Sequence, residues 1–341
     1  MIARPSNRHL ASLAVLCLLA VPACSAKEDK VVVVYTSVDQ VYSEPVLRNF
    51  GQKTGIRVNA AYDVEASKTA GLVNRLIAER DHPQADVFWN SEICRTIVLQ
   101  QKGVLAPYGS PKATDIPARW KDPGGYWTGF AARARVLLYN TDLVPPGDAP
   151  RSIFDLTDPR WKGQAALAYP LFGTTATHMA ALRVVLGEQK ADDFFRALHA
   201  NAVVIVDGNS MARDKAVAGT VKVALTDTDD AIMAIRRGKP VKMVFPDEND
   251  VGTLVIPHTV ALIAGSPHPR EGKLFIDYLL SREVEAELIR TDAGQFPVRA
   301  GIAAPLNIPP LTGLKAMEVD FAAVTGSLDA TGRFLRDLFV R

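Results

Sequence analysis

The sequence predicts an α/β protein of two lobes, and two observations support this fold class. Apolar runs rich in β-branched residues alternate with segments of helical periodicity, and this alternation occurs in each half of the chain. Two long strand-like segments, Gly129–Asn140 and Gly252–Ile263, join the two halves. Two such connections would form a hinge with a cleft between the lobes. The 341 residues suffice for two domains, and a hydrophobic content of 48% favours a packed core.

The first alternation opens with the run V-V-V-V-Y-T-S at Val31–Ser37, which predicts a parallel strand buried on both faces. We expect a helix after it, with Ser43 as N-cap and Pro45 in the first turn. Further strands are expected at Ile56–Tyr62 and Ala85–Trp89, and further helices at Ser67–Arg80 and Glu92–Lys102.

The second alternation predicts strands at Gln164–Ala168, Val203–Val206 and Val221–Leu225, and helices at Thr174–Val185, Ala191–His199, Met211–Val217 and Ala231–Arg237. Pro257 predicts a break, a bulge or an edge position in its strand. The remaining helices are expected at Glu271–Leu280, Glu283–Arg290 and around Ala330–Phe339. We assign residues 31–130 and 260–341 to the first lobe and 131–259 to the second.

The N-terminus predicts a targeting segment. Arg4 and Arg8 precede the apolar stretch Leu10–Ala20, which is shorter than the roughly 20 residues that a membrane span needs. The V-P-A-C at Val21–Cys24 is similar to a bacterial lipobox, whose cysteine is acylated. We expect residues 1–23 to be a signal peptide, Cys24 to carry a lipid, and residues 24–30 to be a tether. Cleavage elsewhere, giving a free periplasmic protein, is the alternative.

Charge, cysteines and motifs exclude several classes of protein. Without residues 1–23, basic and acidic residues balance at 37 each, so a global basic field for nucleic acid is not supported. Cys94 is the one cysteine outside that segment and Cys24, and we expect it to be buried and structural. The chain has no G-x-S-x-G, G-x-x-x-x-G-K-[ST], G-x-G-x-x-G or H-E-x-x-H motif. These absences, with export, favour a binding protein over an enzyme.

Several segments resemble, in order, the extracellular solute-binding proteins of bacterial ABC importers, and within them the ferric-iron-binding group. These segments include F-G-Q-K-T-G-I-R-V at Phe50–Val58, A-D-V-F-W-N-S-E at Ala85–Glu92, D-L-T-D-P-R-W-K-G at Asp155–Gly163 and G-Q-F-P-V-R at Gly294–Arg299. The resemblance implies a periplasmic-binding-protein-like fold of class II type, a ligand between the lobes and docking of the closed form on a permease.

Ligands of open α/β sheets bind beyond the carboxyl ends of strands. The expected ligand-binding residues at those ends are Ser37, Asp39, Glu65, Ser67, Asn90, Ser91, Glu92, Gly173, Thr174, Thr175, Asp227, Asp229 and Asp230. Helix capping is the alternative role for Ser91 with Glu92 in the first turn, for Thr174 or Thr175, and for Thr228. Arg133 and Arg135 share a face of their strand and are expected to meet an anionic ligand or an interlobe carboxylate.

The segment T-D-T-D-D at Thr226–Asp230 departs from the iron-binding group, whose members typically carry adjacent tyrosines there. Asp229 and Asp230 stand in their place. In one hypothesis carboxylates replace the phenolates, and Glu65, Glu92, Asp227 and Asp229 bind Fe(III) or another hard metal. In the other, the loop at Gly173–Thr175 holds the anion of a small organic anion or zwitterion such as a phosphonate, with its cation near the aspartates.

We therefore predict a periplasmic, lipid-anchored, monomeric solute-binding protein that delivers ferric iron or an iron complex to a permease. Iron is here a transported ligand, and no cofactor is expected. The alternatives are a small organic anion as ligand and, in another class, an exported hydrolase. The membrane contact would be the lipid on Cys24, and no nucleic acid is expected as a partner.

Overall fold

The computed structural model describes residues 1–2, 30–63, 70–291, 294–304 and 310–339. Glu65, Ser67 and the whole segment with Cys24 therefore lie outside the described residues. Within the described part no helix is long and apolar enough to cross a membrane.

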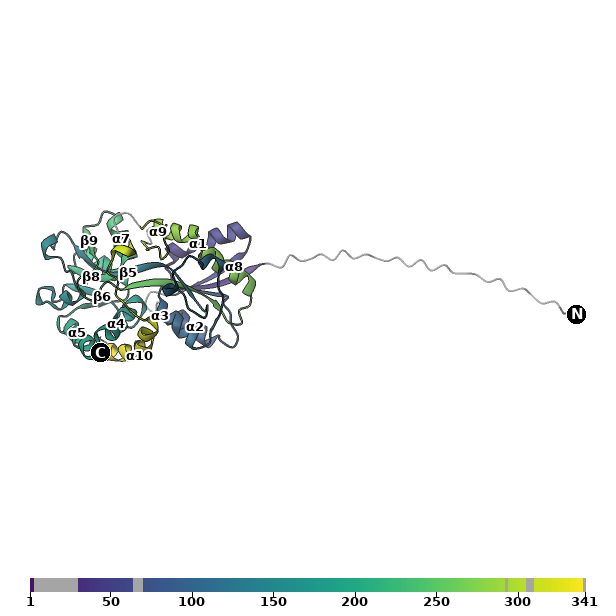
Figure 1. Ribbon diagram of the computed structural model, residues 1–341, viewed down its shortest axis with the longest axis horizontal. Coiled ribbons are helices and arrows are strands. Elements are labelled where there is room, and N and C mark those ends of the chain that lie inside the picture. The colour runs from purple at the N-terminus through teal and green to yellow at the C-terminus, as the bar shows by residue number, and fades with distance from the viewer. Residues whose placement is uncertain (3–29, 64–69, 292–293, 305–309, 340–341) are drawn as a thin grey trace.

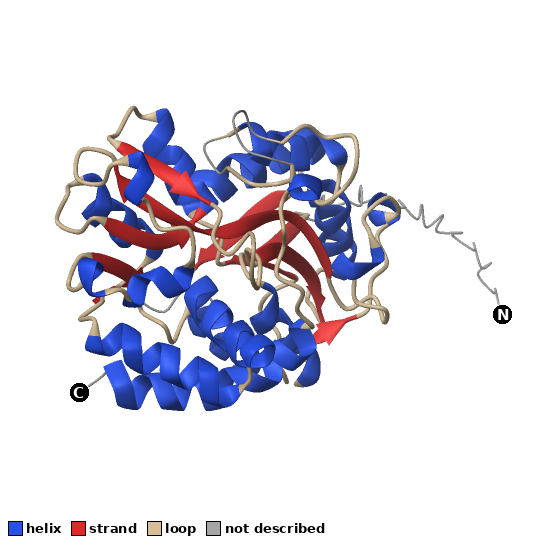
Figure 2. Ribbon diagram, turned by 60° about the vertical axis from the view of Figure 1, so that its left-hand side comes forward, coloured by secondary structure: helices blue, strands red, loops and turns tan. Residues whose placement is uncertain are grey.

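Within the described residues, ten strands form one continuous sheet in the order β2-β1-β3-β10-β5-β8-β6-β7, with β4 beside β10 and β9 beside β5. Helices cover both faces of this sheet, which runs through the middle of the molecule (Figures 1 and 2). The strands are β1 (Val31–Thr36), β2 (Arg57–Tyr62), β3 (Val87–Asn90), β4 (Leu105–Ala106), β5 (Thr128–Asn140), β6 (Ala165–Ala168), β7 (Val204–Val206), β8 (Val223–Asp227), β9 (Val241–Val244) and β10 (Val255–Ile263).

The α-helices follow the strands in the alternation that the sequence predicts, which makes the protein an α/β fold. They are α1 (Gln40–Thr54), α2 (Ala70–Ala78), α3 (Ile93–Gln101), α4 (Gly173–Leu186), α5 (Glu188–Ala200), α6 (Asn209–Val217), α7 (Thr228–Arg236), α8 (Pro269–Leu279), α9 (Arg282–Arg290) and α10 (Phe321–Phe339). Short 3-10 turns such as Ile153–Thr157 lie in the loops.

The two long strands β5 and β10 pair with each other at the centre of the sheet and join its two parallel halves. On one side β1 is parallel to β2 and β3, and on the other β6 is parallel to β7 and β8. The register shifts between Ile256 and His258, so the irregularity expected at Pro257 is confirmed. Opposite it, Ala131 has a φ of 44°, and Ala132 pairs with Phe296 instead of β10. The division into residues 31–130 with 260–341 and 131–259 stays a prediction.

Several elements differ from the sequence prediction. Helix α1 begins at Gln40 with Asp39 as its N-cap, so the assignment of the cap to Ser43 was wrong. The Ser43 hydroxyl donates instead to the carbonyls of Val38 and Asp39, so it cannot cap backbone N–H groups further along. Helix α10 begins nine residues earlier than the expected Ala330, and neither β4 nor β9 was anticipated.

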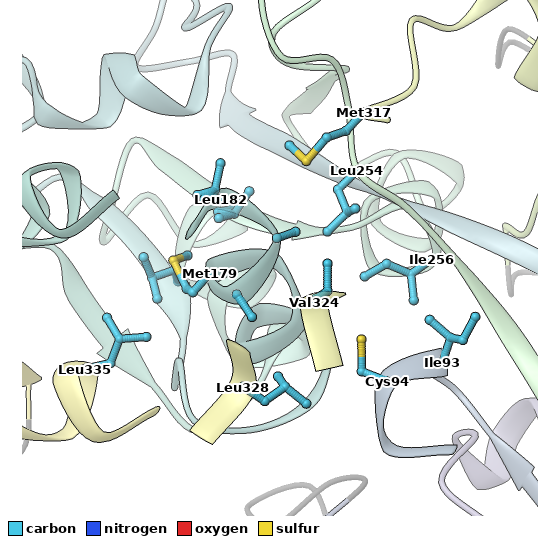
Figure 3. Packing of buried hydrophobic residues seen from close by; sticks show 14 of the residues in the cluster. Ile93, Cys94, Met179, Leu182, Leu254, Ile256, Met317, Val324, Leu328 and Leu335 are labelled. Carbon is cyan, nitrogen blue, oxygen red and sulfur yellow. The ribbon is translucent and has the colours of Figure 1, made fainter. Parts of the chain in front are cut away.

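The apolar core has a layer on each face of the sheet, because alternate residues of each strand point to opposite sides. Val34 and Leu138 lie in one layer, and Tyr35 and Leu137 lie in the other. Figure 3 shows the second layer around Cys94, which faces Val324 of α10. The Cys94 side chain is fully buried, and burial followed by the nearby Glu92 raises the pKa of its thiol well above its usual range. The prediction that Cys94 is buried is confirmed.

Candidate functional site

The turn between β8 and α7 carries three aspartates at the carboxyl end of a buried strand. Asp227 closes β8, and Asp229 and Asp230 lie in the first turn of α7. β5 runs antiparallel beside β8, with Arg135 directly opposite Asp227. Arg133, two residues earlier on β5, also reaches the acidic turn. The acidic turn and the long central strand therefore form one charged cluster.

Arg135 and Asp227 are both fully buried and form the centre of this cluster. Arg135 Nη1 donates to Asp227 Oδ1 at 2.7 Å, and its two Nη atoms reach the hydroxyls of Thr174 and Thr175 at 3.1 Å each. Asp227 Oδ2 accepts hydrogen bonds from Thr174 Oγ1 at 2.7 Å and from Asn209 Nδ2 at 2.9 Å. A buried ion pair survives desolvation only when such additional partners satisfy its polar atoms.

Arg133 connects the turn after β3 with the turn after β8. Its Nη1 donates to Asp229 Oδ2 at 2.8 Å and lies 3.4 Å from Asp227 Oδ2, while its Nη2 donates to the Ser91 carbonyl at 3.0 Å. Burial raises the pKa of Asp227, but the attraction of Arg135 and Arg133 outweighs burial, so that pKa is lowered. Both aspartates are therefore engaged by arginine.

Asp230 pairs with a third arginine, because Arg213 Nη1 of α6 donates to Asp230 Oδ1 at 2.9 Å. Burial and the repulsion of Asp229 nevertheless raise the pKa of Asp230 well above its usual range. Asp39, half-buried at the start of α1, acts electrostatically on both Asp230 and Arg133. The structure thus brings Asp39 and the three aspartates of the β8–α7 turn together.

The ends of β1 and β3 meet in a buried hydrogen-bond cluster. Ser37 Oγ donates to Asn90 Oδ1 at 2.6 Å and accepts a hydrogen bond from the Ser91 backbone N–H at 2.9 Å. Asn90 Nδ2 donates to Thr96 Oγ1 at 3.0 Å. These three predicted residues are therefore neighbours, and their hydrogen bonds hold the turn whose carbonyl Arg133 contacts.

Glu92 is the N-cap of α3 and also contacts α4. Its carboxylate accepts hydrogen bonds from the Cys94 N–H at 2.8 Å, from the Arg95 N–H at 2.6 Å and from Thr177 Oγ1 at 2.8 Å. Burial raises its pKa in spite of the positive charge of Arg95. The capping alternative expected Ser91 as the N-cap with Glu92 in the first turn, whereas the cap is Glu92 itself.

The loop before α4 brings Gly173, Thr174 and Thr175 to the charged cluster. The N-cap residue, Phe172, makes no capping bond with its side chain, and Gly173 adopts a φ of 57°, which suits glycine. The capping alternative for the two threonines is wrong, because their hydroxyls turn towards Arg135. The Thr228 alternative fails similarly, since Asp227 holds the N-cap position of α7.

Four residues of this region were not anticipated from the sequence: Asn209, Arg213, Thr177 and Tyr42. Asn209 opens α6 after β7, so the rule that strand ends meet at one edge would have found it. The side chain of Arg213 lies one turn further along α6, and that of Tyr42 reaches Met233 Sδ at 3.7 Å. Nothing in the local sequence distinguishes these two from surface residues.

His178 lies on α4 behind the charged cluster and is fully buried. Both of its ring nitrogens lack hydrogen-bond partners among the described residues. Burial and the charge of Arg135 lower its pKa to about 3, so the ring is neutral at pH 7.

Within the described residues no group of three His, Cys, Asp or Glu side chains forms a metal-binding cluster. Of the four carboxylates in the metal hypothesis, Asp227 and Asp229 pair with arginines and Glu92 caps α3. The fourth, Glu65, and the neighbouring Ser67 lie outside the described residues.

Comparison with known proteins identifies the family. Residues 98–323 match the family described as bacterial extracellular solute-binding protein. The chain is 25% identical to the Fe(3+)-binding periplasmic protein of Serratia marcescens over 92% of each chain. Its fold is similar to the crystal structure of iron-bound HitA from Pseudomonas aeruginosa, with a TM-score of 0.82 over 91% of this chain and 100% of that one. The two sequences are 25% identical.

A further structural relative has a different ligand. The periplasmic binding protein AfuA from Actinobacillus pleuropneumoniae, with exogenous fructose-6-phosphate bound, is 25% identical, with a TM-score of 0.79 over 90% of this chain and 96% of that one. These likenesses confirm the two-lobed fold that the sequence predicted. Because the family match covers well over half of the chain, the protein belongs to the bacterial extracellular solute-binding proteins.

Proposed function

We propose that this solute-binding protein captures ferric iron as an anionic complex between its lobes and delivers it to the permease of an ABC importer. The names of its relatives support iron, since they include the Fe(3+)-binding periplasmic protein of Serratia marcescens and iron-bound HitA. One observation supports a ferric complex over the bare ion as the ligand: all three aspartates of the β8–α7 turn pair with arginines.

The ion pairs of the cluster disfavour a bare cation as the ligand. Arg133, Arg135 and Arg213 engage all three carboxylates of the turn, so none of these carboxylates is free to bind a bare cation. A bare ferric ion would have to approach these guanidinium groups and break their ion pairs, which leaves buried charges uncompensated. A ferric complex with carboxylate ligands brings its own oxygen donors, which Fe(III) prefers, and negative charge for the arginines.

The predicted site residues take defined roles in this proposal. Asp39, Asp229 and Asp230 would partly offset the positive charge of Arg133 and Arg213. Ser37, Asn90 and Ser91 hold the turn after β3 through their hydrogen bonds. The N-terminus of α4 at Gly173, with Thr174 and Thr175, would supply donors for an oxyanion once Arg135 shifts toward the ligand.

A small organic phosphate or zwitterion is the second candidate ligand. The structural relative with bound fructose-6-phosphate favours it. The same donors, Arg135, Thr174, Thr175 and Asn209, suit a phosphate group, and Asp229 or Asp230 suits an amino or hydroxyl group.

A thermal-shift panel separates these ligands. Ferric citrate, ferric ion supplied in carbonate, citrate alone, an aminoalkylphosphonate and a sugar phosphate are each added to the protein. A ligand at one hundred times its Kd adds about 2.7 kcal/mol of stability. We expect the largest shift with ferric citrate, larger than with citrate alone. A shift with the phosphonate or sugar phosphate and none with either iron form would overturn the iron proposal in favour of the second candidate.

We further infer that the protein binds its ligand without turnover, acts as a monomer in the periplasm and is tethered by a lipid on Cys24. Binding without turnover is supported by membership in a family of solute-binding transport proteins. The tether is supported by the V-P-A-C signature before Cys24. Intact mass measurement of the exported protein tests the tether, because an unmodified new N-terminus other than Cys24 would contradict it.

A further inference from the structure

A hollow of about 190 Å³ lies where α10 crosses α2, α3 and α4. Its walls include Asn74 of α2, Arg95 of α3, Phe172 and Ala176 at the start of α4, and Arg333 with Arg336 of α10. Figure 1 shows α10 along the lower edge of the molecule, below α4 and close to α2 and α3. We call this pocket the arginine hollow.

The three arginines of the arginine hollow have no counter-charge of their own. Within the described residues, none of Arg95, Arg333 and Arg336 makes a hydrogen bond or an ion pair through its side chain, in contrast to Arg133, Arg135 and Arg213. Asp329 is the one carboxylate among the described residues that line the pocket. Glu92 attracts Arg95, but its oxygens are turned to the backbone of α3 and to Thr177. The pocket therefore carries an excess of positive charge.

Other features of the pocket also suit an oxyanion. Arg333 and Arg336 are three residues apart, so they project from the same face of α10. The amide of Asn74 adds another hydrogen-bond donor. The volume of about 190 Å³ is large enough for a small oxyanion.

We propose that the arginine hollow, whose lining includes none of the arginines or aspartates of the β8–α7 cluster, binds a small oxyanion bearing phosphate or carboxylate groups. Guanidinium groups form paired, charge-assisted hydrogen bonds with such oxygens. Because α3 and α4 contact each other through Glu92 and Thr177 beside this pocket, the anion would join the segments that meet there. This inference does not depend on which ligand occupies the cleft.

Isothermal titration calorimetry of the whole protein at low ionic strength tests the proposal, with inorganic phosphate and citrate as separate probes. The test variant is R333Q/R336Q, and the control R237Q/R270Q removes two exposed arginines that make no ion pair in the described chain. We expect saturable binding of at least one probe to the native protein and to the control, and an affinity about tenfold or more weaker in R333Q/R336Q.

A third variant, R135Q, separates this site from the cleft. The proposal requires that R135Q keep its affinity for the probe, because Arg135 lies in the buried cluster and not in the arginine hollow. Equal affinity in R333Q/R336Q and the control, loss of binding in R135Q alone, or no saturable binding by any protein would each overturn the proposal. Circular dichroism of each variant confirms that it is folded before titration.

Discussion

The cluster at the β8–α7 turn and the arginine hollow beside α10 use the same side chain under opposite conditions. In the first, Arg133 and Arg135 are buried and each pairs with an aspartate at 2.7–2.8 Å. In the second, Arg333 and Arg336 are exposed and have no such partner within the described residues. Buried charges must be paired within the protein, whereas exposed charges are solvated by water and can stay unpaired until a ligand binds. The comparison shows which arginines are already paired with carboxylates of the protein and which have no such partner among the described residues.

The largest expected loss of stability comes from breaking the buried ion pair between Arg135 and Asp227. We predict that Asp227→Ala lowers the free energy of unfolding by about 3–5 kcal/mol, because it leaves Arg135 charged and buried without its partner. Urea unfolding followed by circular dichroism measures this. Asp193→Ala, which removes the acid of the exposed pair Asp193–Arg196, is the matched control and should have a much smaller effect. Equal losses of unfolding free energy in the two variants would contradict the account, because the buried pair would then stabilise the protein no more than the exposed pair.

The next largest effect is on the pH dependence of stability, and it comes from the buried imidazole of His178. Because the pKa of His178 is lowered to about 3 in the folded chain, the unfolded chain takes up a proton below pH 6.5 that the folded chain does not. His178 therefore makes the protein less stable as pH falls from 6.5 towards 3. Between pH 7 and pH 5 its contribution is a loss of about 2 kcal/mol.

His178→Gln should remove this part of the pH dependence, whatever its effect on stability at pH 7. Urea unfolding at several pH values measures the slope, and His82→Gln, at an exposed position, serves as the control. An unchanged slope in His178→Gln would contradict the assignment of the loss to this residue.

A smaller effect is expected at the cap that joins α3 and α4. Glu92→Ala should cost about 1–2 kcal/mol, because two backbone N–H groups of α3 and the Thr177 hydroxyl lose their acceptor. Ser281→Ala removes the cap of α9, which does not reach α4, and is the matched comparison. If only the Glu92 variant also alters ligand affinity, the cap has a role in holding the cleft. Melting curves with and without ferric citrate give both quantities.

The smallest effect on stability is expected in the arginine hollow. R333Q/R336Q should leave the melting temperature in a buffer without phosphate or carboxylates unchanged, because both side chains are exposed and unpaired within the described chain. Addition of phosphate should raise the melting temperature of the native protein more than that of the variant. A large loss of stability without any anion would mean that these arginines belong to the fold and would erase the contrast with Arg133 and Arg135.

The regular elements were predictable because the spacing of apolar residues differs between strands and helices. The alternation and the two long central strands followed from apolar patterns, and Pro257 marked the irregular point of β10. The start of α1 was not predictable from Ser43 and Pro45, because Asp39 lies early enough to place both inside the helix. The start of α10 was missed because Gly326 interrupts the helical pattern before Ala330.

The neighbourhood of the site was predictable, but the partners of its charges were not. Strand-end topology brought Ser37, Asn90, Thr174 and Asp227 to one region, as the sequence suggested. The pairing of Arg135 with Asp227 depends on the register of β5 against β8, and that register is a long-range property. The contacts of Arg213 and Thr177 likewise depend on how helices pack.

Direct titration of ferric citrate into the native protein, Arg133→Gln and the exposed control Arg270→Gln tests the central claim. The claim is that the arginines of the β8–α7 cluster receive the negative charge of a ferric complex. We predict saturable binding to the native protein and the control, and an affinity weakened about tenfold or more in Arg133→Gln. Equal affinity in all three proteins, or tighter binding of ferric ion in carbonate to Arg133→Gln than to the native protein, would contradict it.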